Sequence, residues 1–465
     1  MEQKINTEES FRDSIATVTK EGKRIWIYPK KPSGKFYRAR TIVSIILLAF
    51  LFGAPFITID GHPFIILNVI ERKFILFGIP FGPHDLHLFA LTMIAFIVSI
   101  FLFTVVYGRL FCGWICPQTV FMEMVFRKIE YWIEGDSNKQ KQLNKSPWTI
   151  NKFFKKSSKQ IIFFTISFMI ANIFLAYIIG MDQLKRYISD SPSEHLGTFI
   201  AVLIFSGIFY FVFAYFREQA CTLVCPYGRL QGVMLDKNSV VIHYDYKRGE
   251  PRGKIKKNVE QNLGDCIDCN LCVDVCPTGI DIRNGTQLEC VNCTACIDAC
   301  DNVMDKLKRP RGLIRYASKN QIETGKQSLL TPRAIGYTFV LFVLTVLILF
   351  MLINRTPVEL SILRTPGLLF QEQPDNKISN IYDLKIVNKT FDHLPAHLEL
   401  QNINGEVKLI GKELYVEPQG VTEAKFLVIL PKNELKGMKT PLQIAVKSND
   451  KVLDVIQTSF LGKVK

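Results

Sequence analysis

Cysteine is missing from most of this chain of 465 residues. All 12 cysteines lie between Cys112 and Cys300, and the long C-terminal segment has none, so an inter-sheet or inter-loop disulfide is excluded there. Cysteines that gather in one part of a sequence favour metal binding and redox chemistry over a disulfide framework.

Acidic residues are also outnumbered: 42 Asp and Glu residues against 57 Lys and Arg residues give a formal net charge of +15. Such an excess can indicate nucleic-acid binding, but the basic residues flank apolar segments and form no nucleic-acid recognition motif. We therefore expect no nucleic-acid partner. A hydrophobic content of 48% that includes 35 Phe predicts membrane spans with basic loops, in a chain long enough for two or three domains.

Five apolar runs are long enough to cross a bilayer, which takes about twenty residues. They cover residues 41–59, 86–107, 160–179, 197–216 and 334–353. The polar, basic residues before the first run lack the early apolar core of a cleaved signal peptide, so we expect a retained tail. The apolar stretch at 63–83 is interrupted by charges and prolines, which predicts an external amphipathic or re-entrant segment. If this stretch spans the membrane, the topology below changes.

The basic residues predict the orientation of the spans. The loop between the second and third runs carries ten Lys and Arg residues, whereas the loops at 60–85 and 180–196 carry two each. The positive-inside rule then places the N-terminus, the basic loop and residues 217–333 in the cytoplasm. Because the chain has five spans, the C-terminal segment lies on the opposite side of the membrane. We expect membrane lipid as the partner of the spans.

The C-terminal segment has the pattern of an all-β domain. Seven short alternating runs are separated by Asn, Gly, Pro and Lys turn signals, at residues 383–387, 397–400, 407–410, 414–416, 424–430, 442–446 and 452–458. This number of short strands in about a hundred residues predicts an Ig-like β-sandwich. Its default role is that of a binding or interaction module.

Eight cysteines form two runs with the spacing C-x2-C-x2-C-x3-C, at residues 266–276 and 290–300. In bacterial ferredoxins this spacing holds two 4Fe-4S clusters, each with three thiolates from one run and the fourth from the other. The expected ligands are Cys266, Cys269, Cys272 and Cys300 for one cluster, and Cys290, Cys293, Cys296 and Cys276 for the second. A structural zinc site is the alternative. Zinc would be bound by two CxxC pairs, which would leave the last cysteine of each run without an explanation.

The remaining four cysteines form two CxxxCP motifs, Cys112 with Cys116 after the second span and Cys221 with Cys225 after the fourth. A spacing of four residues predicts both thiols of a pair on one helix face, with the proline where that helix ends or kinks. The motifs are expected at the cytoplasmic membrane face. Arg109 and Arg229 stand beside them and are expected to lower the thiol pKa values.

Three interpretations of these four thiols stay open at this point. They can be small side chains packed between helices, a binding site for a soft ion such as Cu(I), or a dithiol couple reduced by the clusters. Met122 and Met124 are possible thioether ligands, although packing is their more common use.

The sequence resembles the CcoG/FixG/RdxA family of membrane-bound accessory proteins for the assembly of cbb-type cytochrome c oxidase. The matching segments are GRLFCGWICPQTV at 108–120, EQACTLVCPYGRLQG at 218–232, the double ferredoxin run and the Ig-like segment. The resemblance covers nearly the whole chain. One departure is that Asp301, not proline, follows the last cysteine of the second run.

The resemblance implies a cupric reductase of the bacterial inner membrane. A cytoplasmic donor would supply electrons through the two clusters to Cys112, Cys116, Cys221 and Cys225, where Cu(II) becomes Cu(I). Oxidase subunits or other assembly factors are the expected protein partners, and the chain could form a homo-oligomer. A quinol-linked electron carrier and a non-enzymatic assembly scaffold are the alternatives.

These expectations divide the chain into five parts. They are a basic tail (1–40), a four-span bundle with the first CxxxCP motif (41–216), a cytoplasmic segment with the second motif and a ferredoxin domain at about 258–305 (217–333), a fifth span (334–353) and a β-sandwich (354–465).

Overall fold

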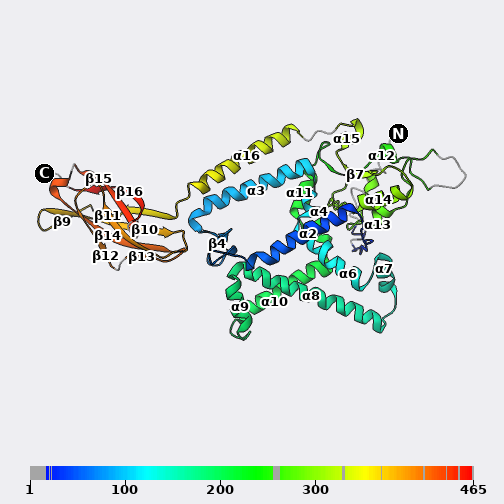
Figure 1. Cartoon of the computed structure of the whole chain (residues 1–465), viewed down its shortest axis with the longest axis horizontal. Coiled ribbons are helices and arrows are strands. Elements are labelled where there is room, and N and C mark those ends of the chain that lie inside the picture. Colours follow the sequence, from blue (N-terminus) through cyan, green and yellow to red (C-terminus); the bar gives the residue numbers. More distant parts are fainter. Residues whose placement is uncertain are drawn as a thin grey trace. The chain divides into compact units, whose positions relative to one another are not determined.

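A computed structural model describes residues 17–19, 21, 23–254, 262–326, 330–367, 369–411, 414–435, 437–448 and 451–462 (Figure 1). Most of the first half of the predicted basic tail and the first residues of the predicted ferredoxin domain lie outside these ranges. The chain divides into two compact units, residues 1–56 with 91–346 and residues 57–90 with 347–465. All 12 cysteines belong to the first unit.

Five helices are long and apolar enough to cross a membrane, as predicted. These segments are Lys35–Phe56, Pro83–Tyr107, Ile150–Ile179, Leu196–Phe216 and Pro332–Ile353. Their helices are α2 (Lys35–Gly53), α3 (Leu86–Tyr107), α8 (Ile150–Ile179), α10 (Leu196–Phe211) and α16 (Pro332–Ile353). Helix α8 begins before the predicted run because the Thr149 hydroxyl accepts a hydrogen bond from the Lys152 N–H at 3.3 Å and caps it. Several lysines assigned to a loop are therefore helical.

Aromatic rings on α8, and on the turn that directly continues α10, pack against the segment that follows the first CxxxCP motif. The ring of Phe126 lies 4.7 Å from that of Phe163 and 4.9 Å from that of Phe213, centre to centre. All three side chains are buried, and α8 and α10 lie side by side in Figure 1. This packing fixes the membrane ends that carry the two motifs.

The CxxxCP motifs lie in short helical segments. The first motif spans α4 (Leu110–Trp114) and α5 (Pro117–Thr119), followed by the π-helix η4 (Val120–Phe126) and by α6 (Arg127–Ile133). The second spans the π-helix η6 (Ala220–Val224) and α11 (Pro226–Met234), after a further π-helix, η5 (Val212–Phe216). Because π-helical turns are rare and concentrate at functional sites, their presence beside both motifs marks this region.

The ferredoxin segment is built on the antiparallel pair β6 (Val241–Tyr244) and β7 (Ile314–Ala317), which meet at Val241 and Ala317 and at Tyr244 and Ile314. Its main helices are α13 (Leu271–Asp274) and α14 (Ala295–Lys306). The buried carboxylate of Asp298 on α14 accepts hydrogen bonds from the Phe36 and Tyr37 N–H groups at 3.1 and 2.7 Å. These bonds cap the first membrane helix from the ferredoxin segment.

The remaining short helices in the described part of the first unit are η2 (Ala54–Phe56), α7 (Ser137–Lys145), α9 (Met181–Ser189), α12 (Tyr246–Gly249), η7 (Ile282–Asn284) and α15 (Lys319–Thr324).

The stretch at 63–83, predicted as an external amphipathic or re-entrant segment, lies before the second long apolar segment, which begins only at Pro83, and it folds into short strands. It forms the antiparallel sheet β3 (Ile65–Asn68), β4 (Lys73–Leu76) and β5 (Ile79–Phe81), preceded by the pair β1 (Thr58–Ile59) and β2 (His62–Pro63). Phe77 and Gly78 adopt positive φ angles of 54° and 76°. Positive φ at both central residues is the signature of a tight hairpin turn, so the charges and glycine mark turns between strands.

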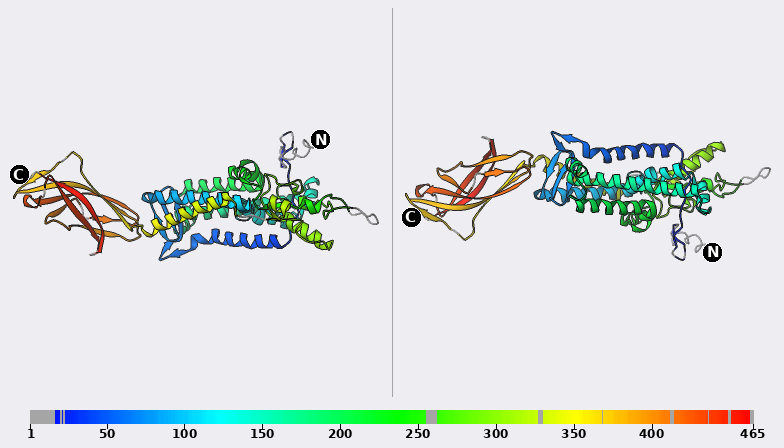
Figure 2. Two further views of the ribbon diagram at one scale, coloured as in Figure 1. Left: turned by 90° about the horizontal axis from the view of Figure 1, so that it is seen from above. Right: turned by 90° about the horizontal axis from the view of Figure 1, so that it is seen from below.

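The C-terminal segment is all-β, as predicted (Figures 1 and 2). One sheet has the order β12-β14-β10-β8, with β9 on β10, and the other has the order β13-β11-β15-β16. The predicted runs correspond to β10 (Lys377–Asn388), β11 (Leu394–Leu400), β12 (Glu406–Ile410), β13 (Leu414–Val416), β14 (Val421–Pro431), β15 (Lys439–Ser448) and β16 (Lys451–Leu461). Two strands were not predicted: β8 (Val358–Arg364) and the three-residue strand β9 (Gln371–Gln373).

A buried ion pair joins the small hairpin sheet to the sandwich within the second unit. The Asp85 carboxylate, 2% exposed, lies 2.8 Å from the Arg355 guanidinium and 3.0 Å from the Lys389 ammonium. Arg355 also donates to the Pro80 carbonyl at 2.6 Å. Residues 57–90 are therefore part of the same folded unit as the sandwich.

Candidate metal centres

Four cysteines from both ferredoxin runs line one cavity, which we call the distal cavity. They are Cys266, Cys269, Cys272 and Cys300. Its other walls include Tyr244, Leu313 and Ile314 from the β6 and β7 strands, so the ferredoxin core closes around the sulfurs. The cavity thus takes three cysteines from the first run and one from the second.

A second cavity, which we call the proximal cavity, has the complementary composition. Its lining includes Cys276 from the first run and Cys290, Cys293 and Cys296 from the second, with Cys272 shared between the two cavities. Apolar side chains such as Ile242, Ile280 and Ile282 form the remaining wall. The structure therefore brings together the cysteines of each predicted set.

The two runs also share one backbone conformation. Asp268 and Asn270 have φ angles of 54° and 59° in the first run, and Asn292 and Thr294 have 53° and 65° at the equivalent positions of the second. Left-handed backbone is unfavourable for such residues and persists where the surroundings require it. The left-handed conformation recurs after the first and second cysteine of each run. This repetition indicates that it orients the cysteine side chains toward the cavity.

Sulfur spacing distinguishes a cluster from a single zinc ion. Thiolates about 2.3 Å from one tetrahedral zinc lie roughly 3.8 Å from one another. Within the described residues, no three cysteine sulfurs lie within 4.8 Å of one another. Four cysteines from two runs around each mostly apolar cavity are the donors that a multi-iron cluster takes.

Burial raises the pKa values of most of these thiols. The pKa is about 12 for Cys272, Cys290 and Cys300 and about 11 for Cys293, because the apolar surroundings disfavour the thiolate. Without metal these thiols stay protonated at neutral pH. Cluster insertion must displace the protons, which couples binding to pH.

The cysteines of a CxxxCP motif do not share a helix, so this prediction was wrong. Cys112 lies in α4, which ends at Trp114, whereas Cys116 is extended at ψ 125° and precedes α5. Cys221 lies in η6 and Cys225 precedes α11. Each proline is the first residue of the next helix rather than the end of the previous one, a position that suits its fixed φ and missing N–H.

The four membrane-face thiols nevertheless lie near one another. Burial raises the pKa of Cys221 to about 12, and negative charge on Cys116, Cys112 and Cys225 would raise it further. Burial also raises the pKa of Cys112 to about 12, and this outweighs the opposing effect of Arg109. Arg109 thus lowers the pKa of Cys112 as predicted, but burial has the larger effect, so the thiolate is not favoured. The side chain of Arg229 lies outside the described residues.

The first motif packs directly against the proximal cavity. A Cβ atom on Gly113 would lie 2.5 Å from the Val291 carbonyl oxygen and 2.6 Å from that of Asn292, so only glycine fits this approach. Cys112 packs against the small apolar cluster that contains Val291 and Cys293. The first motif and the proximal loop are thus in van der Waals contact.

The second motif reaches the same region through a shared wall. A small cavity beside Cys221 is lined by Met122, Glu123 and Glu218, and also by Pro277, Thr278 and Val291. The last three residues line the proximal cavity as well. The Thr278 hydroxyl is 3.4 Å from the Cys276 sulfur, so one residue separates a proximal cysteine from the space beside Cys221.

Gln231 joins the two motifs, and the sequence analysis missed it. This fully buried side chain on α11 accepts a hydrogen bond from the Cys112 thiol at 3.1 Å and donates to the Thr104 hydroxyl at 3.3 Å. Its only sequence signal is its place one turn and a half after Cys225.

Buried ion pairs hold the helices that carry the motifs. Glu130 on α6 lies 2.6 Å from Arg217, and Arg127 lies 2.5 Å from Glu123 and 3.5 Å from Glu218. Burial would raise the pKa of Glu130, but the cations beside it, chiefly Arg217, hold that pKa below its usual value. The pairs therefore position the residues on both sides of Cys221.

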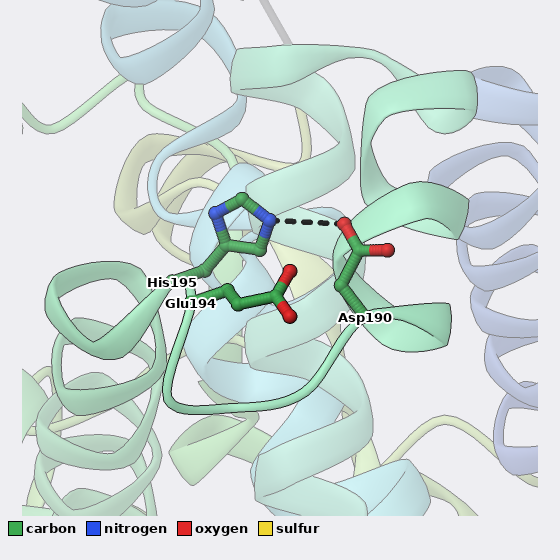
Figure 3. Close-up of side chains that lie close together, drawn as sticks. All are labelled: Asp190, Glu194 and His195. Carbon is green, nitrogen blue, oxygen red and sulfur yellow. Dashed lines mark hydrogen bonds and ion pairs between the residues drawn. The ribbon is translucent and has the colours of Figure 1, made fainter.

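A separate group of possible metal ligands lies between α9 and α10. The ligand atoms of Asp190, Glu194 and His195 lie within 4.8 Å of one another (Figure 3). His195 is hydrogen-bonded to Asp190 at 3.0 Å and stacks on Tyr187. All three side chains reach solvent, and these contacts account for the arrangement without an ion.

The apolar helices and the two cysteine-lined cavities define a membrane-bound iron–sulfur protein. Family models match at residues 89–139, "4Fe-4S binding domain", at 216–319, "4Fe-4S dicluster domain", and at 348–463, "IG-like fold at C-terminal of FixG". The chain is 31% identical to the nitrogen fixation protein FixG of Rhizobium meliloti, over 94% of this chain and 93% of FixG.

Two further relatives come from Cereibacter sphaeroides. Protein RdxB is 33% identical over 79% of this chain and 80% of its own length, and protein RdxA is 33% identical over 78% and 79%. The chain therefore belongs to the FixG/RdxA family and is an iron–sulfur oxidoreductase of that type.

Proposed function

We propose that this protein reduces Cu(II) to Cu(I) at Cys112, Cys116, Cys221 and Cys225, for assembly of a cbb-type cytochrome c oxidase. The observation that carries the proposal is the contact of Gly113 with the Val291 and Asn292 carbonyl groups, which supports a place for the first motif beside the proximal cavity. When bound, two 4Fe-4S clusters supply single electrons. Each Cu(II) accepts one of these electrons, and a low-potential cytoplasmic donor replaces it.

The chain's own residues favour the reduced ion. Cu(I) prefers soft sulfur ligands, whereas oxygen and nitrogen ligands suit Cu(II). Copper at this set would bind to thiolates of Cys112, Cys116, Cys221 and Cys225. Met122 lines the cavity beside Cys221 and is the nearest additional soft donor there. Ligating thiols lose their protons as copper binds.

The proposed topology places the ferredoxin segment and the thiols in the cytoplasm and the β-sandwich outside the membrane. The support is the charge asymmetry of the loops. We further propose that the sandwich docks oxidase subunits or other assembly factors. Labelling of spheroplasts with a membrane-impermeant lysine reagent tests the topology: labelled lysines are expected within residues 354–465 and not within the ferredoxin segment.

A stoichiometric reduction experiment tests the copper chemistry. The purified full-length protein is reduced anaerobically, freed of reductant and mixed with Cu(II), and Cu(I) is trapped by a Cu(I)-specific chromogenic chelator. Two one-electron clusters should yield up to about two Cu(I) per chain. The quadruple variant C112S/C116S/C221S/C225S should yield far less, although its iron content and cluster EPR signals match those of the unmodified protein.

Undiminished reduction by the quadruple variant would exclude the thiols from the reaction. Iron quantitation supplies a second decisive result, because one family match, at 89–139, contains Cys112 and Cys116 and is a 4Fe-4S model. Eight irons per chain leave these thiols free for copper. Twelve irons, falling to eight in the quadruple variant, would assign them to a third cluster and overturn the copper proposal.

A quinol-linked electron carrier is the second candidate, and one cavity favours it. A space of about 800 Å³ lies among α2, α8, α9 and α10, with almost entirely apolar walls and with Asp190 and His195 in its lining. However, α10 and η5 separate these residues from Cys221 by about twenty residues, or roughly 30 Å of helix. A quinol there would be far from the thiols. Quinone in organic extracts of the purified protein, with quinol-dependent cluster reduction, would favour this candidate.

A further inference from the structure

Two buried arginines flank the proximal cavity. Arg40 on α2 donates through Nε to the Gly113 carbonyl at 2.6 Å and through Nη1 to the Cys293 carbonyl at 3.4 Å. Arg109, at the start of α4, donates through Nη1 to the Leu288 carbonyl and to the Cys290 carbonyl, the latter at 3.4 Å. Their exposed fractions are 3% and 5%. Both guanidinium groups therefore touch the backbone of proximal cysteines away from water.

Neither charge is neutralised locally. Within the described residues, Arg40 and Arg109 form hydrogen bonds to neutral carbonyl groups and no ion pair. Nη2 of Arg40 and Nε of Arg109 are buried and have no hydrogen-bond partner in that part of the chain. A buried cation without an anion is strongly unfavourable. The unpaired charges fit a cavity that is anionic when its four thiolates hold a cluster.

The distal cavity has the opposite arrangement. Its one charged lining residue, Arg283, lies 2.6 Å from the Asp281 carboxylate and 2.5 Å from that of Asp268. These two carboxylates more than balance the guanidinium. Of the carboxylates on the proximal side, Glu123 is paired with Arg127 at 2.5 Å, and Asp298 on α14 accepts hydrogen bonds from the Phe36 and Tyr37 N–H groups rather than from either arginine. The two cavities thus differ in local charge by several units, with the positive excess at the proximal cavity.

We propose that Arg40 and Arg109 are positioning residues that make the reduction potential of the proximal cluster more positive than that of the distal cluster. Reduction adds one negative charge to a cluster, and nearby positive charge favours it. The buried site disfavours extra charge, but the same low dielectric strengthens the attraction to two adjacent guanidinium groups. An electron therefore settles in the proximal cluster, beside Gly113 and Cys112. The inference rests on the two clusters of the proposed function and not on copper.

EPR-monitored redox titration of the full-length protein tests the inference. The unmodified protein should show two cluster potentials. In Arg40→Gln and in Arg109→Gln the more positive potential should become more negative, while the other stays in place. Arg40→Lys keeps the charge and should retain most of the original potential. Arg311→Gln, an exposed arginine paired with Asp305, is the matched control and should change neither potential.

A purely structural role predicts a different result, in which iron per chain falls but the potentials of the retained clusters do not move. That result, or a shift confined to the more negative potential, would overturn the inference. If Arg40→Gln does not retain iron, the other two variants decide the test. An unchanged proximal potential in Arg109→Gln would overturn the inference, and the original potential in Arg40→Lys would support it. Copper reduction can fail while both potentials behave as expected, so the two proposals fail separately.

Discussion

The ferredoxin segment contains eight cysteines around two cavities, whereas the β-sandwich has no cysteine and surrounds a core that includes Tyr382, Phe426 and Phe460. In the first region the two metal sites occupy the middle of the fold. Metal binding therefore contributes to the free energy of folding of this region. In the second, apolar burial alone serves this purpose. The two regions should therefore respond to entirely different perturbations.

The largest expected effect is loss of a proximal cysteine. Cys293→Ser should reduce iron from eight to about four per chain and expose the ferredoxin segment to proteolysis, because a buried cavity loses its metal. The β-sandwich should stay protease-resistant. Iron quantitation and mass spectrometry of limited digests measure both. Cys112→Ser, which alters the same apolar cluster, is the control and should keep eight irons; equal iron loss in both variants would contradict the assignment.

The converse perturbation removes a large side chain from the sandwich. Phe426 is fully buried and stacks on Tyr382 with ring centres 5.4 Å apart. Phe426→Ala should lower the free energy of unfolding of the sandwich by about 3–5 kcal/mol, measured by hydrogen exchange, with unchanged cluster EPR signals. Tyr415→Ala, at a side chain 54% exposed on β13, should cost little. Altered EPR signals in Phe426→Ala would show that the two regions do not fold independently.

The two regions should also differ in acid sensitivity. Burial on β6, together with Lys319, lowers the pKa of His243 from 6.5 to about 4. Between these values the unfolded chain binds a proton that the folded chain does not, so stability is full above pH 6.5 and falls as the pH decreases toward 4. From pH 7.5 to pH 5 the loss is about 2 kcal/mol.

Hydrogen exchange of the β6 and β7 amides measures this loss. His243→Gln should flatten the pH dependence, whereas His397→Gln, at an exposed position on β11, should leave it intact. A slope that persists in His243→Gln would assign the acid sensitivity to other groups.

A smaller effect is expected where the first motif meets the ferredoxin segment. Gly113→Ala places a Cβ atom 2.5 Å from the Val291 carbonyl oxygen, and such overpacking costs about 1–3 kcal/mol. The separation of Cys112 from the proximal cavity should increase, and Cu(I) production should slow although iron content is kept. Gly207→Ala on α10, whose Cβ meets nothing within 4 Å, is the matched control. Equal rates in the two variants would argue against the contact.

The smallest effect concerns Gln231. Gln231→Leu removes the acceptor of the Cys112 thiol, a bond worth about 1 kcal/mol. Thermal stability should fall slightly, and the reactivity of Cys112 toward an alkylating reagent should rise. Unchanged reactivity would show that the bond does not hold the thiol.

Local patterns predicted much of the molecule, and they failed where a residue's neighbours come from elsewhere in the chain. Apolar length located the five long helices, and alternation located seven strands of the sandwich. The predicted helix from Cys112 to Cys116 was wrong because proline starts a new helix there. The predicted lowering of the thiol pKa by Arg109 is outweighed by burial, and the guanidinium is directed to the Leu288 and Cys290 carbonyl groups.

The sequence by itself determined which cysteines could share a metal, because the repeated spacing limits how three sulfurs can surround one cavity. It also determined the apolar helices and the cysteine-free β-sandwich. Only the tertiary structure decided that Gly113 and Cys112 lie against the Val291–Cys293 loop. It also decided that, within the described residues, Arg40 and Arg109 form no ion pair there while Arg283 pairs with two carboxylates. These facts depend on contacts between residues as far as 253 positions apart, where no local pattern carries the information. Charge near a metal site is set by such contacts.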